Sequence, residues 1–177
     1  MYNREYTPER ITELKPNEIF VFGSNLAGAH GGGAARLAYE RFGAVLGQGV
    51  GLQGQSYAIP TMQGGVETIK PYVDEFITFS QSRPDLKFYV TQIGCGIAGF
   101  KVAEIAPLFQ DAIDVVNVIL PKEFVDVITT DNNFNLERFV EVQELYDVFM
   151  IDILEASLRK SSEKWHLSTF EAKSGST

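Results

Sequence analysis

Two glycine-rich segments contain the residues with the clearest chemical potential. Residues 23–33 read Gly-Ser-Asn-Leu-Ala-Gly-Ala-His-Gly-Gly-Gly, and residues 94–100 read Gly-Cys-Gly-Ile-Ala-Gly-Phe. Each follows an apolar run and precedes a helical pattern. Glycine lets the backbone approach a ligand closely, and free amides at a helix start attract a phosphate or another anion. Two such loops facing one crevice would suit a diphosphate, although tight turns alone also explain the glycines.

Three side chains in these loops are candidates for chemistry. Asn25 either contacts a ligand or closes a turn through its own backbone. His30 could orient a ribose or act as a general base near neutral pH, and a solvent-exposed histidine without a role is the alternative. Cys95 could be a nucleophile at a helix start, but we favour a small apolar residue that packs behind the loop. No zinc-ligand cluster stands out in the sequence, and we expect no metal and no cofactor.

Alternating apolar runs and helical patterns indicate how the loops are positioned. The patterns predict strands at 19–22, 56–59, 88–93 and 115–120, and helices at 33–42, 66–77 and 102–113, the last disturbed by Pro107. This alternation predicts an α/β fold with a mainly parallel sheet covered on both faces. Ligand sites in such sheets lie at the carboxyl ends of the strands, and both glycine loops fall at that end.

The last third of the chain has a different character. Apolar positions from Leu136 predict a long amphipathic helix to about Lys160, with Asn135 as its cap, and residues 161–177 read as a loosely attached polar tail. We therefore expect one domain over residues 1–125 and a helical extension with a polar tail over residues 126–177. The apolar stripe of this helix either packs within the chain or serves assembly with a second copy or another protein.

Composition excludes several classes of partner. The chain has 177 residues, 45% of them hydrophobic, and a net charge of -8, which argues against binding to nucleic acid or an anionic membrane. A single cysteine precludes an internal disulfide and fits a reducing compartment. The first ten residues do not resemble a signal peptide, and no apolar run approaches the roughly 18 residues of a membrane span. We expect a cytoplasmic protein.

The order of these motifs resembles that of macrodomains over residues 11–125. The segments that carry the resemblance are Gly23–Ala27, His30–Ala35, Tyr57–Thr61 and Thr91–Gly99, of which Ile93–Gly96 is the most specific. The sequence looks closest to a bacterial macro-like family and to the macrodomain class that removes ADP-ribose from acidic side chains. The resemblance implies a three-layer α/β/α fold with a mixed sheet and a cleft for ADP-ribose or a related nucleotide, free or attached to a protein.

The resemblance also implies roles for individual residues. Asn25 falls near the distal ribose, Phe100 borders that ribose, and the two glycine loops hold the diphosphate. If a bond is hydrolysed, Asn25 or His30 positions the water that attacks the anomeric carbon. The full set of implied ligand-binding residues is Gly23, Ser24, Asn25, Gly31, Gly32, Gly33, Thr61, Gly94, Cys95, Gly96, Ile97, Ala98, Gly99 and Phe100.

Departures from the macrodomain pattern leave the recognition of the base and two alternative functions open. The lysine and aspartate of the acid-specific hydrolases are replaced by Met62 and Ala98, so a lysine-based covalent mechanism is not supported. The usual adenine-binding aspartate is replaced by Arg10, so either Glu9 substitutes for it or the base is different. One alternative is therefore a catalytically inactive module that assembles through its C-terminal helix. Another is an enzyme that depends on Cys95 together with His30.

Overall fold

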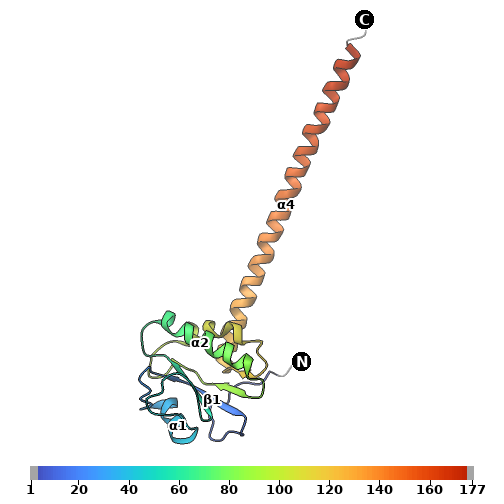
Figure 1. Cartoon of the computed structure of the whole chain (residues 1–177). Coiled ribbons are helices and arrows are strands. Elements are labelled where there is room, and N and C mark those ends of the chain that lie inside the picture. The colour runs from blue at the N-terminus through green and yellow to red at the C-terminus, as the bar shows by residue number, and fades with distance from the viewer. Residues whose placement is uncertain (1–3, 175–177) are drawn as a thin grey trace. The chain divides into compact units, whose positions relative to one another are not determined.

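A computed structural model describes residues 4–174, with the side chains of residue 134 and of residues 161–174 left outside the description. The chain is an α/β protein with a mixed five-stranded sheet and helices (Figure 1). The spatial order of the strands is β2-β3-β1-β4-β5, and all neighbours pair in parallel except β2 and β3. The strands are β1 (Glu18–Ser24), β2 (Gly51–Gln53), β3 (Ser56–Pro60), β4 (Lys87–Val90) and β5 (Val118–Ile119). The prediction of an α/β fold with a mainly parallel sheet is confirmed.

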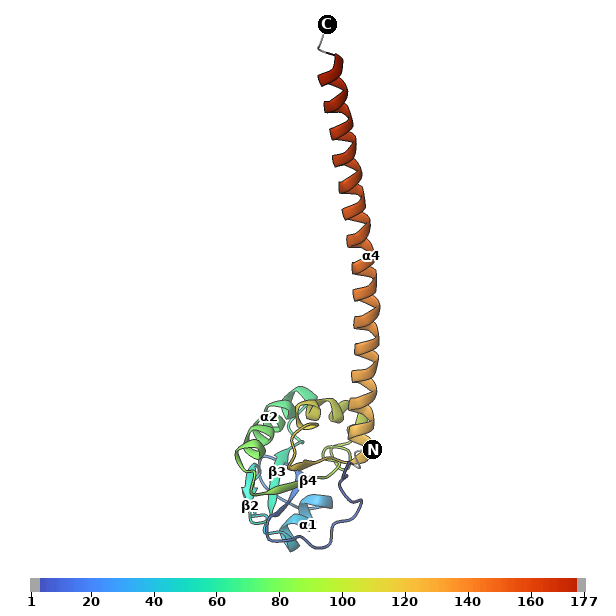
Figure 2. The same ribbon diagram turned by 90° about the vertical axis from the view of Figure 1, so that its right-hand side faces the viewer.

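The helices occupy both faces of the sheet (Figure 2). Because side chains alternate along a strand, Ile19 and Val21 of β1 enter one core while Phe20 and Phe22 enter the other. The first core includes α2, the 3-10 helix η1 and the start of α4, and the second includes α1. The helices are α1 (Gly33–Arg41), α2 (Val66–Ser82), α3 (Val102–Ile105), η1 (Ala106–Ala112) and α4 (Lys122–Ser174).

Three of the predicted elements are shorter than the sequence suggested, and one element was not predicted. The strand expected at 115–120 is reduced to the two residues of β5. The helix expected at 102–113 changes to 3-10 geometry at Ala106, because Pro107 has no amide hydrogen for the α-helical ladder. The strand expected at 88–93 ends at Val90, which releases the next three residues into a loop. Strand β2 was missed because three residues with no apolar alternation carry no strand signal.

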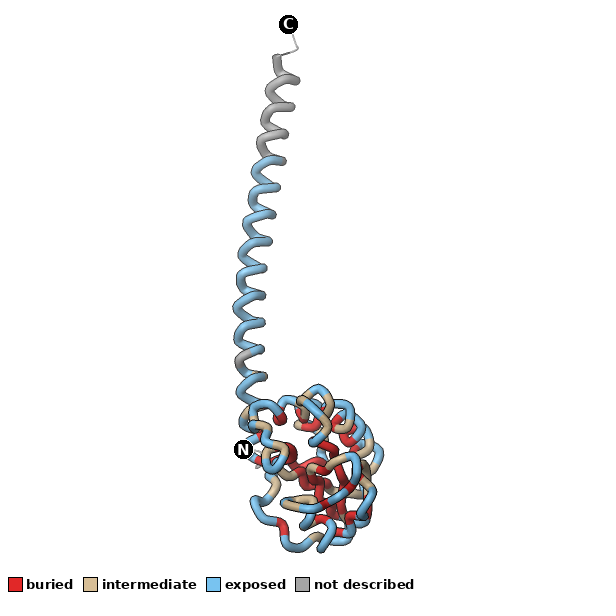
Figure 3. Tube along the Cα trace, turned by 90° about the vertical axis from the view of Figure 1, so that its left-hand side faces the viewer, coloured by how far each residue is buried: buried red, intermediate tan, exposed pale blue. Residues whose placement is uncertain are grey.

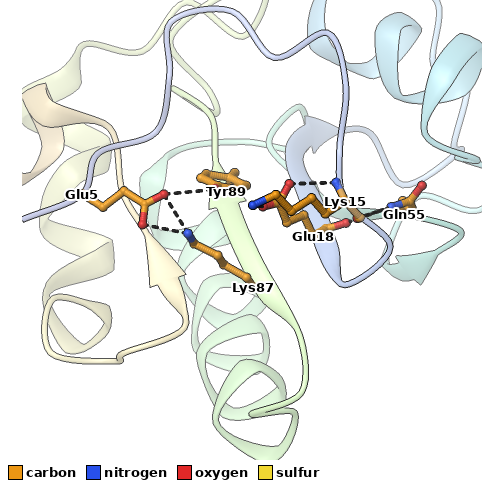
Figure 4. A network of polar contacts seen from close by, with 6 residues as sticks. All are labelled: Glu5, Lys15, Glu18, Gln55, Lys87 and Tyr89. Atoms are coloured by element: carbon orange, nitrogen blue, oxygen red, sulfur yellow. Dashed lines mark hydrogen bonds and ion pairs between the residues drawn. The ribbon is translucent and has the colours of Figure 1, made fainter.

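The extended segment before β1 is tied to the sheet by polar contacts (Figure 4). The carboxylate of Glu5 accepts hydrogen bonds from Lys87 Nζ at 2.7 Å and from Tyr89 Oη at 2.9 Å. The hydrogen bond from Lys87 lowers the pKa of Glu5, against the opposing effect of partial burial. Thr7 Oγ1 donates to the carbonyl of Ile119. These contacts hold residues 5–9 beside β4 and β5.

The C-terminal helix begins earlier than the sequence suggested, so the expected cap at Asn135 is wrong. Helix α4 starts at Lys122, and its first turns are held by the buried side chains of Phe124 and Ile128. It continues to Ser174, where the sequence had suggested a polar tail from residue 161. Tertiary packing of the first turns therefore carries the helix through the polar residues 129–133, which the sequence pattern alone treats as a break.

The chain divides into two compact units, residues 1–130 and residues 131–177. The first contains the sheet, both cores and the first turns of α4. The second is the remainder of α4, in which every side chain from residue 135 to residue 160 is exposed (Figure 3). Among the described residues, no helix is both long enough and apolar enough to cross a membrane.

Candidate functional site

A cavity of about 210 Å³ lies where three neighbouring parallel strands end. The residues that follow β1, β3 and β4 open onto it. The chain leaves β1 toward α1 on one face of the sheet and leaves β4 toward α3 and η1 on the other. Such a reversal between adjacent strands is where α/β sheets bind ligands. The lining residues are Gly23, Ser24, Asn25, His30, Gly31, Gly32, Gly33, Ala34, Ala35, Thr61, Met62, Thr91, Gln92, Ile93, Gly94, Gly96, Ile97 and Ala98.

Most of the residues expected to bind a ligand lie together in this lining. Three do not: Cys95, Gly99 and Phe100. Cys95 and Phe100 pack instead against the apolar core below the second loop. The family resemblance had implied that Phe100 borders the ligand, but Phe100 does not line the cavity. Six lining residues were absent from the expected set, namely Ala34, Ala35, Met62, Thr91, Gln92 and Ile93. The sequence had placed Thr91, Gln92 and Ile93 inside the strand expected at 88–93, Ala34 and Ala35 in the helix expected at 33–42, and Met62 in the segment after the strand expected at 56–59.

The first glycine loop is hydrogen-bonded to a neighbouring segment, residues 45–49. The amide of Gly47 donates to the carbonyl of Gly28 at 3.0 Å, and Ser24 Oγ donates to the buried carbonyl of Gly49. Gly28 has φ of +63°, and a Cβ atom there would overlap the backbone of Gln48. Only glycine fits at this position, since it combines a left-handed backbone with contact to another chain segment.

Asn25 contributes to the shape of the same loop. Its Oδ1 accepts a hydrogen bond from the amide of Ala29 at 3.1 Å, so the side chain closes a turn. The side-chain oxygen of Asn25 thus has the turn-closing role that was one of the two interpretations of this residue. Asn25 also lines the cavity, and its remaining hydrogen-bonding capacity there is the Nδ2 amide group.

His30 is buried rather than solvent-exposed, so the exposed interpretation is wrong. Its side chain is 3% exposed, its ring meets Phe22 edge-on, and its φ of +46° is unusual for a residue other than glycine. Nε2 lies 3.0 Å from the carbonyl oxygen of Val45. Because a carbonyl only accepts, Nε2 carries the hydrogen, and Nδ1 of the neutral ring is left as an acceptor. Nδ1 is buried without a hydrogen-bond partner among the described residues.

Backbone amides from both loops surround the cavity. The start of α1 leaves the amides of Gly33, Ala34 and Ala35 without intrahelical acceptors. In the second loop, local hydrogen bonds such as Gly99 N to Gly96 O shape the backbone. Within residues 4–174, no acceptor is recorded for the amides of residues 96–98. All six of these residues line the cavity, so both loops bring amides with unused hydrogen-bonding capacity to its wall.

The two loops meet at Ile97. A Cβ atom on Gly32 would lie 3.0 Å from Ile97 Cδ1, which is tighter than ordinary contact. The Ile97 side chain is 73% exposed, so it spans the edge of the cavity without packing into the core. A larger residue at Gly32 must therefore displace Ile97 or fill the space between the loops.

The electrostatics of the site come from amides and not from charged side chains. The lining contains no lysine, arginine, aspartate or glutamate. Partial burial, assisted by the negative charge of Glu104, raises the pKa of the Cys95 thiol above its ordinary value. A raised pKa opposes thiolate formation at neutral pH and argues against Cys95 as a nucleophile. Among the described residues, no cluster of three or more His, Cys, Asp or Glu side chains could hold a metal ion.

A second hollow of about 340 Å³ adjoins the cavity through the shared residues Thr91 and Gln92. Its other walls come from the segment before β1 and from the start of α4, and they include the carboxylates of Glu9 and Glu123. The contacts of Glu5 and Thr7 with the sheet hold this segment in place. The amide-lined cavity thus shares two lining residues with a hollow that offers hydrogen-bond acceptors.

Fold and site together define an α/β protein with an uncharged, amide-lined cavity at the carboxyl ends of its central strands. Among known proteins, this chain matches no family model, no curated protein and no solved structure. The function is therefore inferred from the geometry of the site and the order of its motifs.

Proposed function

We propose that this protein is macrodomain-like, with a three-layer α/β/α fold, and that its cavity binds ADP-ribose or a related nucleotide. The observation that carries the proposal is that residues with unused backbone amides in two glycine loops line one cavity, whose lining has no charged side chain. Oriented amides and a helix start bind phosphate groups without requiring lysine or arginine. This explains how a chain of net charge -8 could hold an anionic ligand.

The size of the cavity favours a ligand with more than one part. Pockets that bury a small molecule usually measure about 300–1,000 Å³, so a cavity of about 210 Å³ holds only a portion of a nucleotide. The diphosphate and distal ribose fit the amide-lined portion. The base then lies in the adjoining hollow beyond Thr91 and Gln92, where Glu9 can accept a hydrogen bond from an exocyclic amino group.

If the protein also breaks a bond, we assign His30 as the general base that accepts the proton of the attacking water. A water held between His30 Nδ1 and Asn25 Nδ2 attacks the anomeric carbon of the distal ribose and gives its proton to Nδ1. The bond from that carbon to the acceptor's oxygen breaks, and the acceptor leaves as a carboxylate, as from an ADP-ribosylated protein. The unpartnered Nδ1 supports this assignment, because a buried acceptor without a partner is costly until a ligand or water satisfies it.

Titration calorimetry of the whole protein with ADP-ribose, and with ADP, AMP and NAD as comparisons, tests the binding proposal. We expect ADP-ribose to bind and Gly32→Glu to abolish binding, because the new side chain meets Ile97 and brings a negative charge to the diphosphate site. Gln81→Glu adds the same charge at an exposed position of α2 and should bind like the wild type. No heat with any of the four ligands at millimolar concentration would remove the proposal.

Two further variants separate the base subsite from the chemistry. Glu9→Gln should weaken ADP-ribose binding about tenfold, as expected for loss of one charged hydrogen bond, and leave the affinity for ribose 5-phosphate unchanged. His30→Gln should lower release of ADP-ribose from a modified protein by roughly 100-fold while changing ADP-ribose affinity little. Binding without any release by the wild type would contradict the catalytic part alone.

A further inference from the structure

The exposed part of α4 carries more apolar surface than a solvated helix does. Thirteen large apolar side chains between residues 136 and 158 are exposed by 37% to 71%. Isolated helices gain little stability in water, and large exposed apolar patches mark interaction sites. The thirteen are Leu136, Phe139, Val140, Val142, Leu145, Tyr146, Val148, Phe149, Met150, Ile151, Ile153, Leu154 and Leu158.

Six apolar residues have the spacing that is typical of a coiled-coil seam. These residues recur at alternating intervals of three and four, which correspond to heptad positions a and d. They are Phe139, Val142, Tyr146, Phe149, Ile153 and Ala156. Neither a charged nor an amide side chain interrupts the seam over these residues. A partner helix that fits must therefore also present an uncharged apolar seam.

The acidic side chains of the same segment lie away from that seam. Glu137, Glu141, Glu144, Asp147 and Glu155 occupy the outer positions b, c or f of this heptad register, and Asp152 alone occupies a flanking g position. In a parallel pair, each g residue faces an e residue of the next heptad in the partner, so Asp152 meets Ser157. Two copies can therefore align without opposing like charges.

We propose that residues 136–158 bind the same segment of a second copy of this chain. Eight of the thirteen lie at or beside the seam, and with on the order of 60 Å² for each side chain they provide on the order of 500 Å² per partner, so two copies bury about the 1,000 Å² that a specific interface requires. The other five lie on the outer face, where an assembly of more than two helices would cover them. Apolar residues also flank the seam at Leu145 and Met150, which widens the face beyond a two-stranded minimum. The bundle can therefore accommodate more than two helices.

Other occupants fit these residues less well. Between residues 136 and 158 the segment has six acidic residues and one basic residue, Arg138. An anionic membrane surface repels such a segment, because interfacial helices use lysine and arginine on their polar face. A basic protein partner would pair with the outer acidic face and leave the uncharged seam exposed.

Sedimentation velocity of the full chain across a concentration series tests self-association. We expect a dimer or larger assembly at micromolar concentration. The double variant Tyr146→Glu with Phe149→Glu puts charges into the seam and should weaken association by roughly 100-fold or more. The matched double variant Glu141→Gln with Glu144→Gln changes the same number of residues on the outer face and should assemble like the wild type.

Two results would overturn the proposal. One is a wild-type chain that remains monomeric at about 100 µM, a concentration well above the dissociation constant expected for an interface of this size. Binding of such a monomer to anionic vesicles would then identify a membrane surface as the occupant. The other is an assembly that the seam variant leaves intact. Thermal unfolding of the seam variant serves as the folding check, because both substituted residues are exposed and should leave residues 4–130 unchanged.

Discussion

The two glycine loops look alike in sequence but are supported in opposite ways. The first loop, residues 23–33, is held by contacts with residues 45–49, including those of Ser24, Gly28 and His30. The second loop, residues 94–99, is shaped by hydrogen bonds within itself and its immediate neighbours. Among the residues that the structure describes, nothing lies within 4 Å of a Cβ atom built on Gly96 or Gly99. Gly28 in the first loop is thus fixed by packing, whereas Gly96 and Gly99 in the second loop have no described neighbour that excludes a side chain.

This difference assigns distinct tasks to the two sides of the cavity. The first loop presents preformed donors at the start of α1 and a buried histidine, and preformed donors bind without an ordering cost. In the second loop, Gly94 and Cys95 pack toward the core, whereas residues 96–99 have few contacts beyond that of Ile97 with the first loop. We therefore expect the first loop to dominate stability and the second to adjust when a ligand enters.

The largest expected effect is the replacement of Gly28 by alanine. The methyl group overlaps the backbone of Gln48 and the residue must keep a φ of +63°, so we expect a loss of about 3 kcal/mol. Gly96→Ala in the second loop should change stability by less than about 0.5 kcal/mol. Chemical denaturation of both variants measures the contrast. Equal stabilities for the two variants would contradict the difference between the loops.

A smaller loss is expected for Ser24→Ala. The substitution leaves the buried carbonyl of Gly49 without its side-chain donor, which should cost about 1–2 kcal/mol. Ser82→Ala removes a similar hydrogen bond, to the carbonyl of Phe79, at an exposed position where water can replace it. This control should lose less than about 0.5 kcal/mol. If Ser24→Ala left the free energy of unfolding unchanged, the hydrogen bond to residues 45–49 would not hold the first loop.

The strands and the loops that follow them could be predicted because their signals are local. Ile19–Phe22 is a short continuous apolar run that ends at a glycine, which is typical of a buried strand. Parallel strands then bring their carboxyl ends to one edge, so that most of the cavity lining followed from the order of elements. The burial of His30 could not be predicted, because it depends on the carbonyl of Val45 in a segment that has no regular pattern of its own.

Errors at the other end of the domain have a related cause. The sequence pattern placed the start of the C-terminal helix at Asn135, whereas the buried side chains of Phe124 and Ile128 anchor a helix that begins at Lys122. Phe100 was placed at the cavity by family resemblance alone, and the turn at Gly94 directs it against Ile105 and the core instead. In both cases a tertiary contact outweighed the local pattern.

A still smaller effect on stability is expected for Ile97→Ala in the second loop. Because the side chain is 73% exposed and touches only the edge of the first loop, unfolding free energy should change by less than about 0.5 kcal/mol. Ala106→Gly is a useful comparison, since Ala106 is fully buried at the start of η1 and should lose about 1 kcal/mol. A loss for Ile97→Ala as large as this would show that Ile97 stabilises the closed arrangement of the loops.

The smallest effect concerns Cys95, which reports whether the second loop opens. Burial, with a contribution from Glu104, raises the pKa of this thiol above its ordinary value of 9.0, so the neutral form is favoured in the folded protein. The rate of iodoacetamide labelling should therefore rise with pH to a midpoint above 9.0 in the native protein and fall back to the ordinary value in urea. Glu104→Gln should shift the native midpoint only slightly downward, because burial is the larger cause. A native midpoint equal to that in urea would mean that the second loop opens freely on the labelling timescale, which would extend the difference between the loops from packing to dynamics.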